Sequence, residues 1–203
     1  KWATRKNGFR DFWSSYDWFI LDPHSNYHDA PEWYFGDLFQ EALDSSVGHE
    51  IGSHTFSHIR CDLASKDEFS TDMALLQNIF KHYNRKMLSH AFPWDIEGHT
   101  RLLKNYGITT CRLKYGRFPS EITNNSRREI DVKYESLAGT PLYPALIKYG
   151  IDIAQKKNGI FTWLLHPENL HRKNDLKIFR KIIEYINKCS KKKLINISTL
   201  SME

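Results

Sequence analysis

Apolar residues recur at helical spacing in five stretches of the chain. The clearest stretch is 66–84, where Phe69 and Met73 belong to one apolar stripe, as on the buried face of an amphipathic helix. Pro31 suits the first turn of a helix that continues to Leu43. The remaining predicted helices are 97–106, which Gly107 ends, 141–157 and 175–192.

Short runs rich in apolar and β-branched residues lie between these helices and predict β-strands. The predicted strands are 47–53, 87–92, 108–113, 160–165 and 194–200. Two segments show no clear period. The aromatic-rich segment 1–30 is predicted to be a long, packed loop, and 114–138 a long loop with at most one strand.

The alternation of strands and helices predicts an α/β fold built from parallel βα units. In a barrel of such units, the chemistry lies at the carboxyl ends of the strands. We therefore expect functional side chains directly after residues 53, 92, 113 and 165, and polar or aromatic candidates follow each of these positions.

The composition is that of one folded domain over residues 1–203. With 40% hydrophobic and 26% charged residues, the chain is too apolar for a disordered protein and has enough apolar residues for a core. No run approaches 18 consecutive apolar residues, so we expect no membrane span.

Charge and cysteine content restrict the partners. The net charge of +5 comes largely from basic clusters at 156–157, 172–173 and 191–193, which we interpret as a solvated basic surface and not as a nucleic-acid footprint. Three cysteines without CxxC spacing favour a reduced compartment, so we expect a cytoplasmic protein. The oligomeric state stays open.

A pair of histidines follows the predicted strand 47–53. In the run His54-Thr55-Phe56-Ser57-His58, the two imidazoles are four residues apart, so one helical turn would bring both to the same cation. Such spacing is common by chance, and a hydrogen-bonded structural pair is the alternative. The position of the pair after a strand and a small-residue turn favours a metal site.

The run 48–58, Gly-His-Glu-Ile-Gly-Ser followed by these five residues, resembles the second motif of the polysaccharide deacetylase family, whose members carry the NodB-homology domain. The resemblance implies a distorted, TIM-like barrel of seven or eight βα units. It also implies that His54 and His58 bind a divalent metal ion, with zinc as the first candidate.

The run Thr162-Trp163-Leu164-Leu165-His166-Pro167 resembles the fifth family motif, Leu-x-His. By this resemblance His166 is the general acid that protonates the departing amine, a proton transfer that suits the pKa of histidine. Trp163 and Leu165 would line an apolar pocket for the acetyl methyl group. A structural role for a single histidine at a strand end is the alternative.

The third family motif, Arg-x-Pro-(Tyr/Trp)-Gly, is matched only in part by 91–95, which reads Ala-Phe-Pro-Trp-Asp. Pro93 and Trp94 agree with the motif, and the resemblance implies that the backbone N–H of Trp94 binds the oxyanion. Ala91 replaces the arginine that orients the catalytic base. Two residues are candidates to compensate for the missing arginine. They are Arg112 and Asp95, which would supply a carboxylate of its own.

Two family motifs lack a clear counterpart. The paired aspartates of the first motif, which supply the base and the third metal ligand, are absent because no Asp-Asp occurs in the chain. The stretch 17–23 resembles a loop of archaeal-type members, so we expect the first one or two βα units to be missing. For the fourth motif, Asp131 and Glu135 are candidates without special support.

The resemblance predicts a metal-dependent hydrolase that removes acetyl groups from N-acetylated or O-acetylated sugars or polysaccharides. Pro93, Trp94, Trp163 and Leu165 would contact the carbohydrate, although packing in the core is an equal alternative for the tryptophans. The 203-residue chain alone is expected to bind metal weakly and to be inactive. The alternative function is a catalytically impaired carbohydrate-binding or structural module on the same fold.

Overall fold

The computed structural model describes residues 23, 25–34, 36–113, 128–131, 143–166, 170 and 172–201. The chain divides into two compact units, Lys1–Thr109 and Thr110–Glu203, and each is described by itself. The stretch 17–22, Glu135 and most of the predicted loops 1–30 and 114–138 lie outside the described residues.

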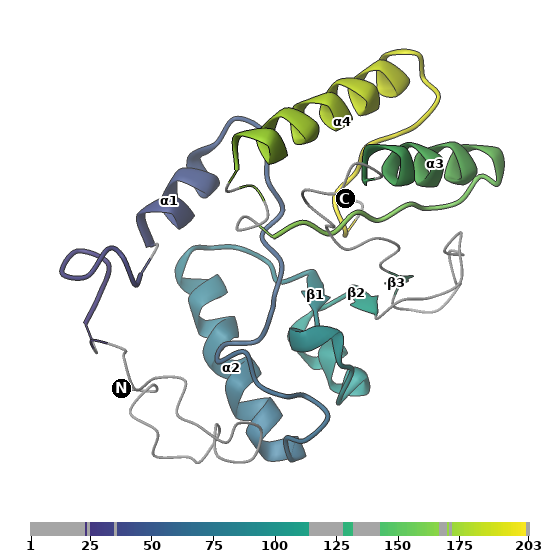
Figure 1. Cartoon of the computed structure of the whole chain (residues 1–203). Coiled ribbons are helices and arrows are strands. Elements are labelled where there is room, and N and C mark those ends of the chain that lie inside the picture. Colours follow the sequence, from purple (N-terminus) through teal and green to yellow (C-terminus); the bar gives the residue numbers. More distant parts are fainter. Residues whose placement is uncertain are drawn as a thin grey trace. The chain divides into compact units, whose positions relative to one another are not determined.

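The regular elements of the first unit are mostly helices (Figure 1). Its elements are α1 (Gly36–Asp44), α2 (Lys66–His82), β1 (Ser89–Ala91) and the short 3-10 helices η2 (Pro93–Asp95) and η3 (Thr100–Tyr106). Helix α2 begins with a capping box, in which the Ser65 side chain accepts the backbone N–H of Glu68, and Glu68 accepts the backbone N–H of Ser65. Two N–H groups that have no partner within the helix are satisfied in this way.

Helix α2 supplies the core of the first unit. Its buried apolar residues are Phe69, Met73 and Phe80, and the apolar stripe predicted from the sequence includes all three. The hydroxyl of Tyr106 donates a hydrogen bond to the Ser70 carbonyl, which ties η3 to α2. The other buried apolar side chains of this unit are Ala30, Ile59, Cys61, Ala64, Met87, Phe92, Leu103 and Ile108.

The second unit combines a small sheet with two helices. Strands β2 (Thr110–Leu113) and β3 (Arg128–Asp131) pair in parallel, with Thr110 opposite Arg128. Helices α3 (Tyr143–Lys156) and α4 (Lys173–Lys191) lie side by side (Figure 1). They share a buried cluster of Ile147, Ile151 and Ile182.

The predicted helices are largely confirmed, with changes at their ends. Helices α2, α3 and α4 lie within two residues of the predicted ranges 66–84, 141–157 and 175–192 wherever the structure describes them. The helix expected from Pro31 begins only at Gly36, because residues 30–34 form hydrogen-bonded turns. The predicted helix 97–106 is the shorter 3-10 helix η3, and Gly107 ends it with a φ of 82°.

The start of η3 is delayed because the chain passes very close to another segment there. A Cβ atom at Gly98 would lie 2.0 Å from the carbonyl oxygen of Cys61, so this approach requires glycine. The next residue, His99, has a φ of 52°, which is left-handed and not helical.

Three predicted strands are absent from the described residues. Of 47–53, only Ser53 pairs, in an isolated parallel bridge with His90; Gly48 has a φ of 68°, which interrupts an extended chain. Residues 160 and 163 make isolated bridges only, and 194–200 has no strand. The sequence pattern of a short apolar run does not distinguish a buried strand from an irregular segment that packs on helices. Phe161 and Ile195 pack in the second way, against the isoleucine cluster of α3 and α4.

The described part of the chain is thus partly helical with a small parallel sheet, and the TIM-like barrel stays a prediction. Strand β3 is the strand that the sequence allowed within 114–138. No helix in the described ranges is long and apolar enough to cross a membrane.

Candidate functional site

The histidine pair begins where residue 53 meets strand β1. Ser53 donates its N–H to the Ser89 carbonyl at 2.8 Å and accepts the Ala91 N–H at 2.9 Å, which forms a parallel bridge. His54, the next residue after Ser53, therefore lies beside the carboxyl end of β1. The sequence predicted that the residues after 53 and 92 carry the chemistry, and the bridge brings these two chain positions together.

One imidazole is fixed by a backbone carbonyl. Nδ1 of His54 lies 2.8 Å from the carbonyl oxygen of Ala91. A carbonyl oxygen only accepts, so Nδ1 carries the proton, and in the neutral ring Nε2 keeps its lone pair. This is the arrangement by which many metal-binding histidines are oriented, with one nitrogen held by a backbone carbonyl and the other available to a cation.

The second imidazole lies against the first. The ring centroids of His54 and His58 are 4.9 Å apart, with an angle of 71° between the planes. Partial burial lowers the pKa of His58, and a positive charge on His54 would lower it further. His58 is thus biased toward the neutral form, which is the form that can bind a metal ion.

The pair fits a divalent cation such as zinc as two of its ligands. Two neutral imidazoles from one turn supply nitrogen ligands of the type that zinc prefers. Within the described ranges, no group of three or more histidine, cysteine, aspartate and glutamate side chains could hold a metal ion. In this pair the described residues could supply two ligands, whereas a zinc site in a protein normally has three or four protein ligands.

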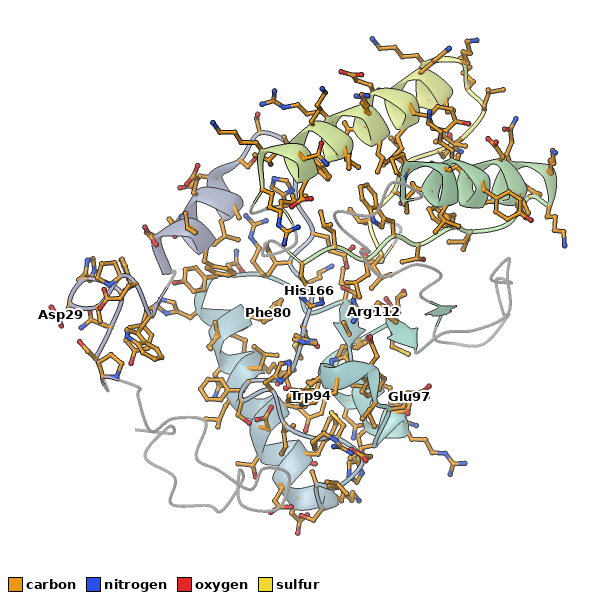
Figure 2. All side chains as sticks on the ribbon, in the orientation of Figure 1. Asp29, Phe80, Trp94, Glu97, Arg112 and His166 are labelled. Atoms are coloured by element: carbon orange, nitrogen blue, oxygen red, sulfur yellow. The ribbon has the colours of Figure 1, made fainter. Side chains whose placement is uncertain are left out.

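The turn after β1 presents an aromatic ring beside the pair. Trp94, which is labelled in Figure 2, is 44% exposed, and its ring centroid lies 5.1 Å from that of His58. Trp94 and Asp95 both have positive φ angles, 62° and 52°. Hydrogen bonds from the N–H groups of Asp95 and Ile96 to the carbonyls of Phe92 and Pro93 close the turn.

A third feature of this site is a buried carboxylate that the sequence analysis missed. Asp72 of helix α2 is fully buried, and its oxygens accept the N–H groups of Phe56 and Ser57 at 2.6 and 3.0 Å and the Ser57 hydroxyl at 2.5 Å. Its sequence position could have indicated this burial, because Asp72 lies three residues after Phe69 and next to Met73, on the apolar face of the helix.

The comparisons with known proteins add no relative. No model of a protein family, no curated protein and no solved structure matches this chain. The functional interpretation therefore depends on the geometry of the residues themselves and on the motif resemblance in the sequence.

The other predicted site residues belong to the second unit. His166 is exposed and Leu165 is half-buried. Trp163 packs against Phe179 of α4, with ring centroids 5.7 Å apart, and contributes to the packing around the isoleucine cluster. Of the two functions considered for this tryptophan, the geometry supports core packing.

Arg112 was the candidate to replace the missing arginine at position 91, and Asp131 and Glu135 were the candidates for the fourth motif. Arg112 and Asp131 lie in the small sheet, and Glu135 lies outside the described residues. Arg112 of β2 is half-buried and pairs in register with Ile130. Asp131 ends β3, opposite Leu113. The structure thus brings together His54, His58 and the turn from Pro93 to Asp95, whereas His166, Trp163, Leu165 and Arg112 are part of the second unit.

Proposed function

We propose that this protein is a metal-dependent hydrolase of the polysaccharide deacetylase type, which removes acetyl groups from N-acetylated or O-acetylated sugars. The single observation that carries the proposal is the His54–His58 pair, with Nδ1 of His54 held by the Ala91 carbonyl and the two rings 4.9 Å apart. Both histidines are exposed at the protein surface, where a cation can reach them.

In this proposal His54 and His58 would hold one zinc ion or a similar divalent cation. When bound, that ion would polarise the acetyl carbonyl and lower the pKa of a water molecule. The protein's own contribution starts with orientation. The hydrogen bond to Ala91 keeps the His54 proton on Nδ1, so Nε2 is the nitrogen that would bind the cation.

The turn after β1 would bind the reacting acetyl group. The backbone N–H of Trp94 would donate to the oxyanion that forms from the acetyl carbonyl, a stabilisation that needs a rigid donor. Pro93 is buried and is the first residue of η2, so the turn is anchored on one side. Asp95 supplies a carboxylate in the same turn, next to the amide that binds the oxyanion.

The proton for the leaving nitrogen would come from His166. Cleavage of the amide produces an amine, which leaves well only after its nitrogen is protonated, and imidazole can donate that proton near neutral pH. By the same motif resemblance, Leu165, which precedes His166, would contact the acetyl methyl group. The exposed ring of Trp94 offers a face for a sugar ring.

A non-catalytic carbohydrate-binding module is the second candidate. It is favoured by Ala91, which stands where the family has arginine, and by the exposure of Trp94. A binding module needs the aromatic face of Trp94, but it needs neither a metal ion nor His166.

Acetate release separates these two functions. The protein expressed from its complete coding sequence is loaded with zinc and incubated with acetylated chitooligosaccharides and with O-acetylated sugars. The proposal expects acetate from one of these substrates, strongly reduced in His54→Ala, in His58→Ala and in His166→Ala. His82→Ala is the control, because His82 is exposed at the end of α2. Sugar binding without acetate release by the zinc-loaded protein would support the binding module instead.

A further inference from the structure

A buried carboxylate lies directly under the turn that carries the histidine pair. Asp72 belongs to helix α2 and is fully buried, between two residues of the helix that fill the core, Phe69 and Met73. A carboxylate in such a position is unusual, because the charged form loses its hydration on burial. Burial accordingly raises the pKa of Asp72, although its hydrogen bonds oppose the shift.

The hydrogen-bond donors to this carboxylate come from the centre of the turn. One oxygen accepts the Phe56 N–H at 2.6 Å, and the other accepts the Ser57 N–H at 3.0 Å and the Ser57 hydroxyl at 2.5 Å. Phe56 and Ser57 lie between the two histidines in the sequence. Asp72 therefore contacts the segment that joins His54 to His58.

The backbone of the turn is in a conformation that needs such support. Thr55 has a φ of 62° and His58 a φ of 57°, on either side of Phe56 and Ser57. A positive φ is unfavourable for most residues and particularly so for a β-branched threonine. Backbone conformations of this kind persist where the surrounding structure holds them in place, and they cluster at functional sites.

We propose that Asp72 is the positioning residue of the histidine pair: its carboxylate holds the turn in this conformation, so that both imidazoles face the same side. The effect of Asp72 on cation binding rests on the proposed function. Its effect on the distance between the two rings does not, because that distance can be measured in the metal-free protein. The alternative is that Asp72 stabilises the fold in general and has no particular effect on the pair.

Three variants distinguish these roles. Asp72→Asn keeps the shape of the side chain but replaces one accepting oxygen with an NH₂ group, so the amide can no longer accept all three hydrogen bonds. Ser57→Ala removes one of the three and is the milder test, in case Asp72→Asn does not fold. Met73→Ala is the matched control, since it destabilises the same helix from the neighbouring buried position and removes none of the three hydrogen bonds that Asp72 accepts.

The closing measurement is made on the metal-free full chain by NMR, with zinc titration as a second readout. We expect a nuclear Overhauser effect between the His54 and His58 rings in the unmodified protein and in Met73→Ala. We expect its loss in Asp72→Asn and a weaker signal in Ser57→Ala. Zinc affinity per folded molecule should fall about tenfold in Asp72→Asn and change less than about twofold in Met73→Ala.

The inference is overturned if Asp72→Asn keeps the ring-to-ring signal, or if Met73→Ala loses it to the same extent. A failure of the proposed function looks different. If the unmodified protein binds no zinc at the pair, the hydrolase proposal fails, while the ring-to-ring signal in the metal-free variants still decides the role of Asp72.

Discussion

Nδ1 of His54 lies 2.8 Å from the carbonyl oxygen of Ala91, at the end of strand β1. This hydrogen bond joins two segments of the first unit that are 37 residues apart in the sequence. It sets the tautomer of the first imidazole, because the carbonyl accepts the Nδ1 proton. The residue at position 91 contributes through its backbone, so its side chain, an alanine here, does not affect this bond.

The parallel bridge beside this bond leads to a prediction about Ser53. Its hydroxyl makes a hydrogen bond with Nδ1 of the fully buried His90 at 2.5 Å. Ser53→Ala removes that partner inside the core, and we expect the free energy of unfolding to fall by about 1–3 kcal/mol. The measurement is urea denaturation followed by circular dichroism.

Ser70→Ala is the control for that experiment, because Ser70 lies half-buried on α2 and uses its backbone carbonyl, not its side chain, to accept the Tyr106 hydroxyl. We expect a change within about 0.5 kcal/mol. Equal losses in the Ser53 and Ser70 variants would contradict the importance of the Ser53–His90 hydrogen bond.

A second prediction concerns thiol chemistry. Burial raises the pKa of Cys61 to about 12. At pH 8 the thiolate fraction in the folded protein is then about 10⁻⁴, and alkylation by iodoacetamide requires the thiolate. We expect Cys61 to stay unmodified in the native protein and to react fully in denaturant, as measured by peptide mass spectrometry. Rapid native alkylation of Cys61 would show that the thiol is accessible and more acidic than its burial implies.

A third prediction concerns the ion pair between Arg60 and Asp62. The guanidinium donates two hydrogen bonds to the carboxylate, at 2.8 and 2.7 Å, and these lower the pKa of Asp62 below its usual 3.8. Both side chains are partly exposed, so we expect a coupling energy of at most about 1 kcal/mol at neutral pH. A double-mutant cycle with Arg60→Ala and Asp62→Asn measures it.

The sign of the pH dependence follows from the lowered pKa. The folded protein holds the Asp62 proton more weakly than the unfolded chain does, so the stabilisation is complete above pH 3.8 and disappears as the pH falls through the folded-state pKa. A coupling energy that increased toward acid pH would contradict the assignment of this pair.

The helices were the most predictable part of the fold. Helix α2 was predicted within two residues from its apolar stripe, and the capping box of Ser65 and Glu68 fixes its first turn in the structure. The strands were less predictable. Val47 is 75% exposed and Ile197 is 62% exposed, although both lie in runs that were predicted to be strands. Residues with high β-propensity form a strand only where neighbouring strands and a core pack against them, and a short sequence run does not show whether such neighbours exist.

The histidine pair of the candidate site could be picked out from the sequence, but the groups that hold it could not. The spacing of His54 and His58 is visible in the sequence, and the structure brings the rings together. The hydrogen bond from His54 to the Ala91 carbonyl could not be predicted, because every residue has a backbone carbonyl and the residue type does not show which one is used. Asp72 was missed because an acidic residue in an amphipathic helix is usually assigned to the exposed face.

Zinc stoichiometry tests the central claim most directly, namely that His54 and His58 together hold one divalent cation. The protein expressed from its complete coding sequence is titrated with zinc, and bound metal is counted after gel filtration. The account predicts one zinc per chain in the unmodified protein and in His82→Ala, and strongly reduced zinc in His54→Ala and in His58→Ala. Full retention of zinc by both of these variants would contradict it.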